Sequence, residues 1–216
     1  MDFLPEEIDT YSGIHTAPEN ELLKELNRET HLKVLIPRML SGHIQGRILS
    51  MFSHMIKPKN ILEIGTYTGY SALCFAEGMQ EDGKIITLDH NAELETMAKS
   101  YWEKAGLGSK IELKVGEALD IIPTLDPELR YDIVFIDADK ENYSNYFDLI
   151  IDKVNPGGYI IADNVLWSGK VTKEDEVKND LNTRSLDEYN KKIHEDSRVD
   201  NVLFPVRDGL MVARKL

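Results

Sequence analysis

The chain has 216 residues, of which 42% are hydrophobic and 29% charged, and its 25 Lys and Arg against 38 Asp and Glu give a formal net charge of −13. This composition excludes wholesale disorder, and a chain of this length buries roughly 70% of its unfolded surface around one core. The acidic balance also disfavours sequence-independent binding of nucleic acid, because such binding depends on neutralised phosphates.

The cysteine content and the apolar runs indicate the compartment. The single cysteine, Cys74, lies in the apolar run SALCFA, which predicts a buried hydrophobe and excludes an internal disulfide. No stretch approaches the roughly 20 apolar residues of a membrane span. The start, MDFLPEEIDTY, lacks the basic residues and apolar core of a signal peptide. We therefore expect a cytoplasmic protein without a membrane partner.

In chain order, residues 1–57 read as helices without a strand, and residues 58–216 alternate short apolar runs with amphipathic segments. Such alternation predicts right-handed crossovers and a parallel sheet covered by helices on both faces. We expect one domain, residues 1–216, with a helical N-terminal cover over 1–57 and an α/β core over 58–216. The expected strands are 60–65, 84–89, 111–116, 131–137 and 158–163, and the expected helices include 21–34, 45–56, 92–105, 143–154 and 186–198.

The last residues differ from the pattern before them. Asp208-Gly209 separates two β-rich runs, NVLFPV and LMVARK, and Asp-Gly between apolar runs is a strong hairpin signal. The sheet is therefore expected to end in an antiparallel strand.

A glycine-rich loop, Gly65 to Ser71, follows the first expected strand. Tyr67 stands where a dinucleotide fingerprint has its second glycine, and no Gly-Lys-Ser/Thr follows, so a pyrophosphate is a poor fit. Asp89, at the end of the second strand, suits ribose hydroxyls, and Glu63 suits an ammonium group. Together they favour S-adenosylmethionine. The alternative is a structural glycine turn in which Asp89 only caps the loop.

Polar side chains also end the fourth and fifth expected strands: Asp137, and then Asp163 with Asn164. In the usual strand order, the fourth strand neighbours the first, so we expect Asp137 beside the glycine loop. Two carboxylates and an amide oxygen suit Mg²⁺, and also Mn²⁺ or Ca²⁺, better than zinc. The alternative is that these residues only hold turns.

Four segments together resemble the cation-dependent O-methyltransferases, the group that contains the caffeoyl-CoA and catechol O-methyltransferases: LEIGTYTGYSAL, FIDADKENYSNYFD, ADNVLWSGKV and LFPVRDGLMVARK. The resemblance covers about residues 35–216. It implies the class I methyltransferase fold, a Rossmann-like seven-stranded sheet ordered 3-2-1-4-5-7-6 with strand 7 antiparallel. It also implies a homodimer. This chain has Arg207 where relatives often have glycine.

The resemblance assigns roles to individual residues. It implies Lys140 as the catalytic base and three metal ligands, Asp137, Asp163 and Asn164. The implied cofactor contacts are Met39, Glu63, Gly65, Tyr67, Ser71, Asp89, Ala118 and Asp137, and the implied acceptor contacts are Met39, Lys140 and Trp167. Plainer interpretations place Met39 in the core and place Tyr11, Tyr189 and residues 173–180 on the surface.

These observations predict an enzyme that uses S-adenosylmethionine and a divalent cation to methylate a hydroxyl of a vicinal-diol phenol or its CoA ester. The alternative is a tRNA hydroxyuridine O-methyltransferase on the same scaffold, which would need a basic surface near the pocket. A non-catalytic nucleotide-binding module is a third possibility, and Lys140 with all three ligand positions argues against it.

Overall fold

The computed structural model describes residues 5–216, so the first four residues of the predicted N-terminal cover lie outside the described part. The α-helices are α1 (Glu6–Ile14), α2 (Glu21–Lys33), α3 (Gly42–Ile56), α4 (Tyr70–Ala76), α5 (Glu95–Lys104), α6 (Ala118–Ile121), α7 (Tyr143–Ile150), α8 (Glu174–Asn179) and α9 (Leu181–Glu195). The strands are β1 (Asn60–Ile64), β2 (Lys84–Asp89), β3 (Ile111–Val115), β4 (Tyr131–Ile136), β5 (Val154–Asp163), β6 (Val199–Phe204) and β7 (Leu210–Lys215). Short 3₁₀ turns are η1 (Pro37–Met39), η2 (Ala92–Leu94), η3 (Ile122–Thr124), η4 (Lys140–Asn142), η5 (Ile151–Lys153) and η6 (Trp167–Thr172).

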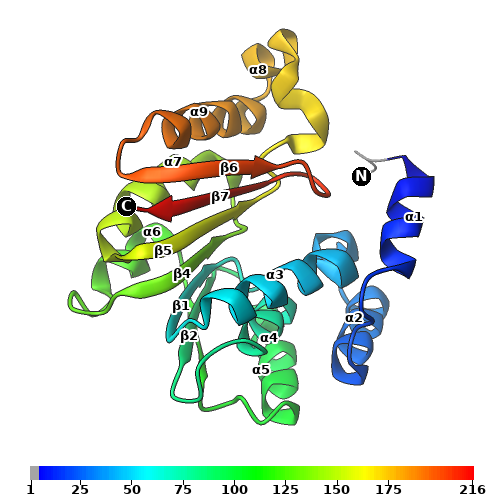
Figure 1. The fold of residues 1–216 in the computed structure, drawn as a ribbon. Helices are drawn as coiled ribbons and strands as arrows, with labels where there is room; N and C mark the ends of the chain where they lie inside the picture. Colours follow the sequence, from blue (N-terminus) through cyan, green and yellow to red (C-terminus); the bar gives the residue numbers. More distant parts are fainter. Residues whose placement is uncertain (1–4) are drawn as a thin grey trace. The chain divides into compact units, whose positions relative to one another are not determined.

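The strand order is β3-β2-β1-β4-β5-β7-β6, as predicted. β7 runs antiparallel to both β5 and β6, so the predicted terminal hairpin is confirmed (Figure 1). Its turn contains two residues with positive φ, Arg207 at 51° and Gly209 at 89°. The class I methyltransferase fold expected from the sequence is therefore present.

Residues 6–117 form one compact unit. Its strands β1, β2 and β3 pair in parallel, and the apolar runs of the sequence fill their buried positions. Helix α3 packs against α4, and α2 packs against α4 and α5. Asn20 caps α2, since its side-chain oxygen accepts a hydrogen bond from the Leu23 amide at 2.9 Å.

Residues 118–216 belong to a second compact unit. Here β4 and β5 are parallel, and α9 packs against α7 and β6. Helix α9 begins at Leu181, five positions before the predicted start at 186, because the Asp180 carboxylate accepts from the Thr183 amide at 3.0 Å and caps the helix there. The prediction of a single domain over 1–216 stays a prediction.

Burial corrects two of the plainer interpretations. Tyr189, expected on the surface, is fully buried and meets the Tyr143 ring edge-on, with centroids 5.5 Å apart. Met39, considered as core, has 55% of its surface exposed. The helical period places Tyr189 on the inner face of α9, whereas η1 presents Met39 outward. The buried Cys74 and the exposed Tyr11 are as expected.

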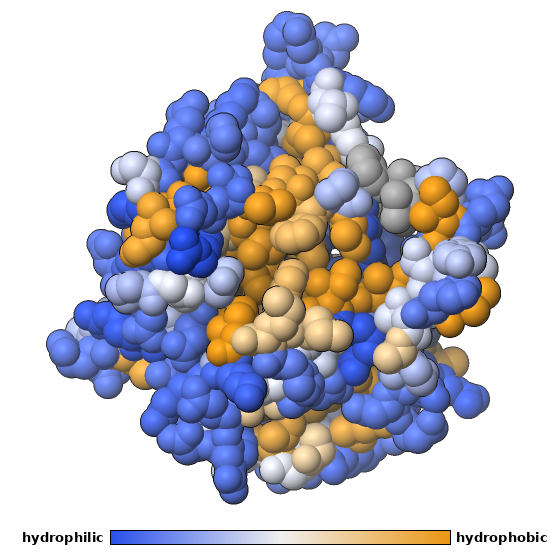
Figure 2. Space-filling model, in the orientation of Figure 1, coloured by the Kyte–Doolittle hydropathy of each residue, from blue (hydrophilic) through white to orange (hydrophobic). Residues whose placement is uncertain are grey.

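The surface of the second unit is polar over α8, which buries none of its residues, as predicted for 173–180 (Figure 2). By contrast, α1 exposes Ile8 and Ile14. Within residues 5–216, no helix has the length and apolar character to cross a membrane.

Candidate active site

The glycine loop leaves β1 through a backbone that only a few residue types adopt readily. Gly65 and Gly69 have φ values of 103° and 80°, and Tyr67 between them has φ of 50°. A Cβ at Gly69 would lie 2.6 Å from the indole nitrogen of Trp102, so this position has no room for a side chain. The loop thereby turns sharply into α4, as the sequence predicts for a ligand-binding turn.

Asp89 at the end of β2 holds this loop. One carboxylate oxygen accepts from the amides of Thr66 and Tyr67 at 3.0 and 2.7 Å, and the other accepts from the Asn91 amide at 2.8 Å. The side chain caps the loop as the plainer interpretation expected. A carboxylate has about four acceptor positions, so Asp89 retains capacity for a ribose hydroxyl.

Glu63 is fully buried at the end of β1. Its carboxylate accepts from the Ser71 hydroxyl at 2.6 Å and from the Thr87 hydroxyl at 2.5 Å. Two of the predicted cofactor contacts, Glu63 and Ser71, thus form one buried polar group. A contact between Glu63 and an ammonium group stays a prediction.

Tyr67 and Met39 meet at one carbonyl group. The Tyr67 hydroxyl donates to the Ile36 carbonyl at 3.0 Å, and the Met39 amide donates to the same oxygen at 3.1 Å. Burial raises the pKa of Tyr67, so its hydroxyl remains a donor. The glycine loop is therefore tied to the segment that precedes α3.

In residues 118–216, the predicted metal ligands follow paired strands. The parallel register joins Ile136 of β4 to Ala162 of β5, so Asp137 and Asp163 come next on neighbouring strands. Such strands lie about 4.8 Å apart. Asp163 is 4% exposed, and Asn164 has a positive φ of 60°. The fold thus brings these residues to one edge of the sheet.

Lys140 extends this group. Its Nζ donates to the Asp137 carboxylate at 3.1 Å and to the Tyr143 hydroxyl at 2.6 Å. The Tyr143 hydroxyl in turn donates to the backbone carbonyl of Asp163 at 3.0 Å. Burial, and next the charges of Asp137 and Asp163, raise the pKa of Tyr143 well above its usual value, which keeps it protonated. Tyr143 therefore fixes the amine of Lys140 relative to the end of β5.

Trp167 lies in the loop that follows Asn164. Its ring centroid is 6.0 Å from Lys140 Nζ, and its side chain is half-buried. Asp139 bonds to other partners than the predicted ligands do: its carboxylate accepts from the Tyr146 hydroxyl and the Asn142 side-chain amide.

The structure therefore gathers the predicted residues in two groups, each within its own unit. The unit 6–117 contains Met39, Glu63, Gly65, Tyr67, Ser71 and Asp89, and the unit 118–216 contains Asp137, Lys140, Asp163, Asn164 and Trp167. Ala118 is buried at the first position of α6, and its methyl side chain has no polar atom with which to bond to either group. Sequence reasoning missed Tyr143, which it treated only as part of an apolar helix face.

The donor set fits a hard divalent cation, because Asp137, Asp163 and Asn164 offer carboxylate and amide oxygens at one sheet edge. Within residues 5–216, no group of three His, Cys, Asp or Glu side chains could hold a metal ion. The predicted set contains two residues of these types, Asp137 and Asp163, and its third member is an asparagine. The adenosine-binding prediction fits the loop, since the glycines allow a ligand to approach the backbone closely and Asp89 retains acceptor positions for a ribose hydroxyl.

Comparison with known proteins agrees with this geometry. The O-methyltransferase family model matches residues 13–216. The caffeoyl-CoA O-methyltransferase 5 of Nicotiana tabacum is 37% identical over 92% of this chain and 85% of its own length. The caffeoyl-CoA O-methyltransferase of Medicago sativa is 36% identical over 92% of this chain and 83% of its own length.

Solved structures are similar over almost the whole chain. The S-adenosylhomocysteine-bound methyltransferase of Podospora anserina has a TM-score of 0.88 at 29% identity, covering 99% of this chain and 98% of that one. The O-methyltransferase of Bacillus cereus in complex with S-adenosylhomocysteine has a TM-score of 0.88 at 28% identity, covering 97% of each chain. The chain belongs to the O-methyltransferase family and is an S-adenosylmethionine-dependent O-methyltransferase.

Proposed function

We propose that this enzyme methylates one hydroxyl of a vicinal-diol phenol, or of its CoA ester, with the help of a divalent cation. The main support is the β4–β5 register, which pairs Ile136 with Ala162 and so makes the next residues, Asp137 and Asp163, neighbours; Asn164 directly follows Asp163. Its relatives named caffeoyl-CoA O-methyltransferases support the substrate class.

Each group of residues has a distinct task in this proposal. S-adenosylmethionine supplies the methyl group, and the cation supplies positive charge that favours the deprotonated form of an acceptor hydroxyl. Asp137, Asp163 and Asn164 would hold the cation through oxygen atoms. Glu63, Ser71 and Asp89 would bind and orient the cofactor, so that its methyl group is held in position for attack by the acceptor oxygen.

Lys140 would receive the proton of the acceptor hydroxyl. Its Nζ is positioned by two fixed groups, the Asp137 carboxylate and the Tyr143 hydroxyl. Lys140 is only 9% exposed, so bulk water has little access to the amine. Trp167, near this amine, would form an aromatic wall beside a planar acceptor.

The deciding experiment measures methyl transfer from labelled S-adenosylmethionine to caffeoyl-CoA, caffeate and catechol, with Mg²⁺ and with a chelator. The matched control acceptor is a phenol with one hydroxyl. Turnover of the diols that is lost in chelator and restored by Mg²⁺ supports the proposal. Equal turnover with and without chelator contradicts the requirement for a cation. Methylation of hydroxylated tRNA, with no turnover of any diol, contradicts the proposed substrate class.

We also propose that the enzyme is a homodimer whose interface includes the N-terminal helices. Large apolar side chains are exposed there, at Ile8, Ile14, Leu32, Leu35, Ile36, Met39, Met51 and Met55. Many exposed large apolar side chains on one part of a chain are typical of a protein–protein contact. Light scattering on the intact chain should give twice the 24.6 kDa chain mass. A mass of one chain at micromolar concentration contradicts the dimer.

A further inference from the structure

The loop that contains Trp167 has an unusual backbone. Trp167, Ser168 and Gly169 are three consecutive residues with positive φ, at 47°, 56° and 74°. Only glycine adopts this region without strain, so the other two residues hold it only where their surroundings impose it. Something outside the loop must therefore impose this conformation.

The β6–β7 turn supplies that constraint. The Val165 amide donates to the Gly209 carbonyl at 3.2 Å, and the Leu166 amide donates to the Asp208 carbonyl at 2.9 Å. A Cβ at Gly209 would lie 2.5 Å from the Leu166 side chain, so the two segments are in close contact.

The third bond of this contact involves a side chain. The Ser168 amide donates to the Asp208 carboxylate at 2.5 Å, across 40 residues of sequence. Asp208 is only 8% exposed. Burial raises its pKa, whereas the Ser168 bond, and then the charge of Lys140, act in the opposite direction. A buried carboxylate is costly, so its retention beside a strained loop needs a reason.

We propose that Asp208 is a positioning residue for the methyl acceptor: by holding the Ser168 amide, it fixes Trp167 in its strained conformation as the wall of the acceptor site. The two bonds to backbone carbonyls hold the start of the loop, and the bond to the Asp208 carboxylate holds the amide of the residue directly after Trp167. This inference rests on the proposed function in one respect, the role of Trp167 beside the acceptor.

The test combines Trp167 exposure with acceptor kinetics. In a Trp102→Phe background, fluorescence reports Trp167 alone, because the chain has two tryptophans. Asp208→Ala should make acrylamide quenching of Trp167 about twofold stronger and raise the acceptor KM roughly tenfold, with a smaller change in kcat, since a charge-assisted bond is lost. Asp208→Asn keeps an acceptor oxygen and should restore both values to within about twofold of the parent.

Two further variants complete the test. Asp208→Leu removes the acceptor but fills the space, and replaces the alanine variant if that variant does not fold. Asp200→Ala, on the same hairpin, removes a carboxylate that is 65% exposed and pairs with Arg214, and should change neither reading. The affinity for S-adenosylhomocysteine should stay within about twofold in every folded variant.

The outcomes separate the inference from the proposed function. Unchanged quenching in both Asp208→Ala and Asp208→Leu overturns the inference whatever the substrate. Stronger quenching with an unchanged acceptor KM also overturns it, because Trp167 then does not position the acceptor. If the parent enzyme turns over no diol, the proposed function fails. The KM comparison is then made with the acceptor that the enzyme does use, and the same two criteria apply.

Discussion

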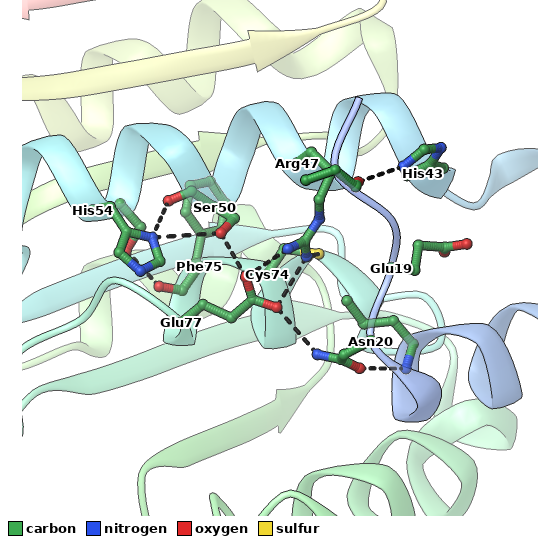
Figure 3. Close-up of polar contacts among 12 residues, drawn as sticks. Glu19, Asn20, His43, Arg47, Ser50, His54, Cys74, Phe75 and Glu77 are labelled. Atoms are coloured by element: carbon green, nitrogen blue, oxygen red, sulfur yellow. Dashed lines mark hydrogen bonds and ion pairs between the residues drawn. The ribbon is translucent and has the colours of Figure 1, made fainter. Parts of the chain in front are cut away.

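The side chain of Glu77 should contribute strongly to the stability of the unit 6–117. Arg47 makes two bonds to its carboxylate, at 2.8 and 2.9 Å, and the Ser50 hydroxyl donates at 2.5 Å (Figure 3). The Asn20 amide group adds a fourth bond at 3.2 Å (Figure 3). Glu77, the C-cap residue of α4, thereby joins that helix to α3 and to the start of α2.

The size of the effect follows from this geometry. Removing one partner of a buried ion pair costs about 3–5 kcal/mol, and an exposed pair contributes about 0–1 kcal/mol. Arg47 and Glu77 retain 17% and 24% of their side-chain exposure, so their pair lies between these limits and closer to the buried case. Without Glu77, both Nη atoms of Arg47 lose this carboxylate as a hydrogen-bond acceptor, which adds to the cost. We expect Glu77→Ala to lower the free energy of unfolding by about 2–3 kcal/mol.

Urea denaturation measures this loss. Trp102 is fully buried in the same unit, so its fluorescence in a Trp167→Phe background follows the unfolding of this part of the chain. With a slope of roughly 2.5 kcal/mol per molar urea, the midpoint should fall by about 1 M. The matched control is Asp82→Ala, which breaks the Lys59–Asp82 pair, 54% and 67% exposed, and should shift the midpoint by less than about 0.3 M. A Glu77→Ala midpoint that moves no further than this control would refute the reasoning.

Three further predictions concern the site and the packing. Asp163→Ala should abolish Mg²⁺-dependent turnover and leave the S-adenosylhomocysteine affinity, measured by calorimetry, nearly unchanged; full activity in chelator would contradict the ligand assignment. Arg207→Gly should raise the free energy of unfolding, measured by urea titration, by about 0.5–1 kcal/mol, because φ of 51° is strained for arginine. A loss of stability would show that the Arg207 side chain contributes more than the strain costs. Gly78→Ala should destabilise by more than about 2 kcal/mol in urea titration, since its Cβ would lie 2.2 Å from the backbone nitrogen of His54; a neutral result would mean that α3 and α4 separate easily.

Much of the fold follows from local patterns. The apolar runs predicted five strands, and Asp208-Gly209 predicted the terminal hairpin, because residues two to four apart determine which face of an element is apolar. The sequence also predicted that Asp137, Asp163 and Asn164 follow neighbouring strands, because strand ends are local features and the carboxyl ends of parallel strands meet at one edge of the sheet.

Other features depended on contacts between distant residues. Tyr189 reads as a surface residue, yet it packs on Tyr143, and the hydroxyl of Tyr143 links Lys140 to β5. Asp208 reads only as a turn residue, and its bond to the Ser168 amide spans 40 residues.

The physical reason is the same in each case. A sequence pattern reports the preference of a short segment, whereas the burial of a polar side chain depends on which partner the fold brings to it. The sequence by itself determined the order of the elements and which polar side chains stand at the strand ends. Only the tertiary structure decided which carboxylates and hydroxyls hold the loops around them, because those partners become neighbours only when the chain has folded.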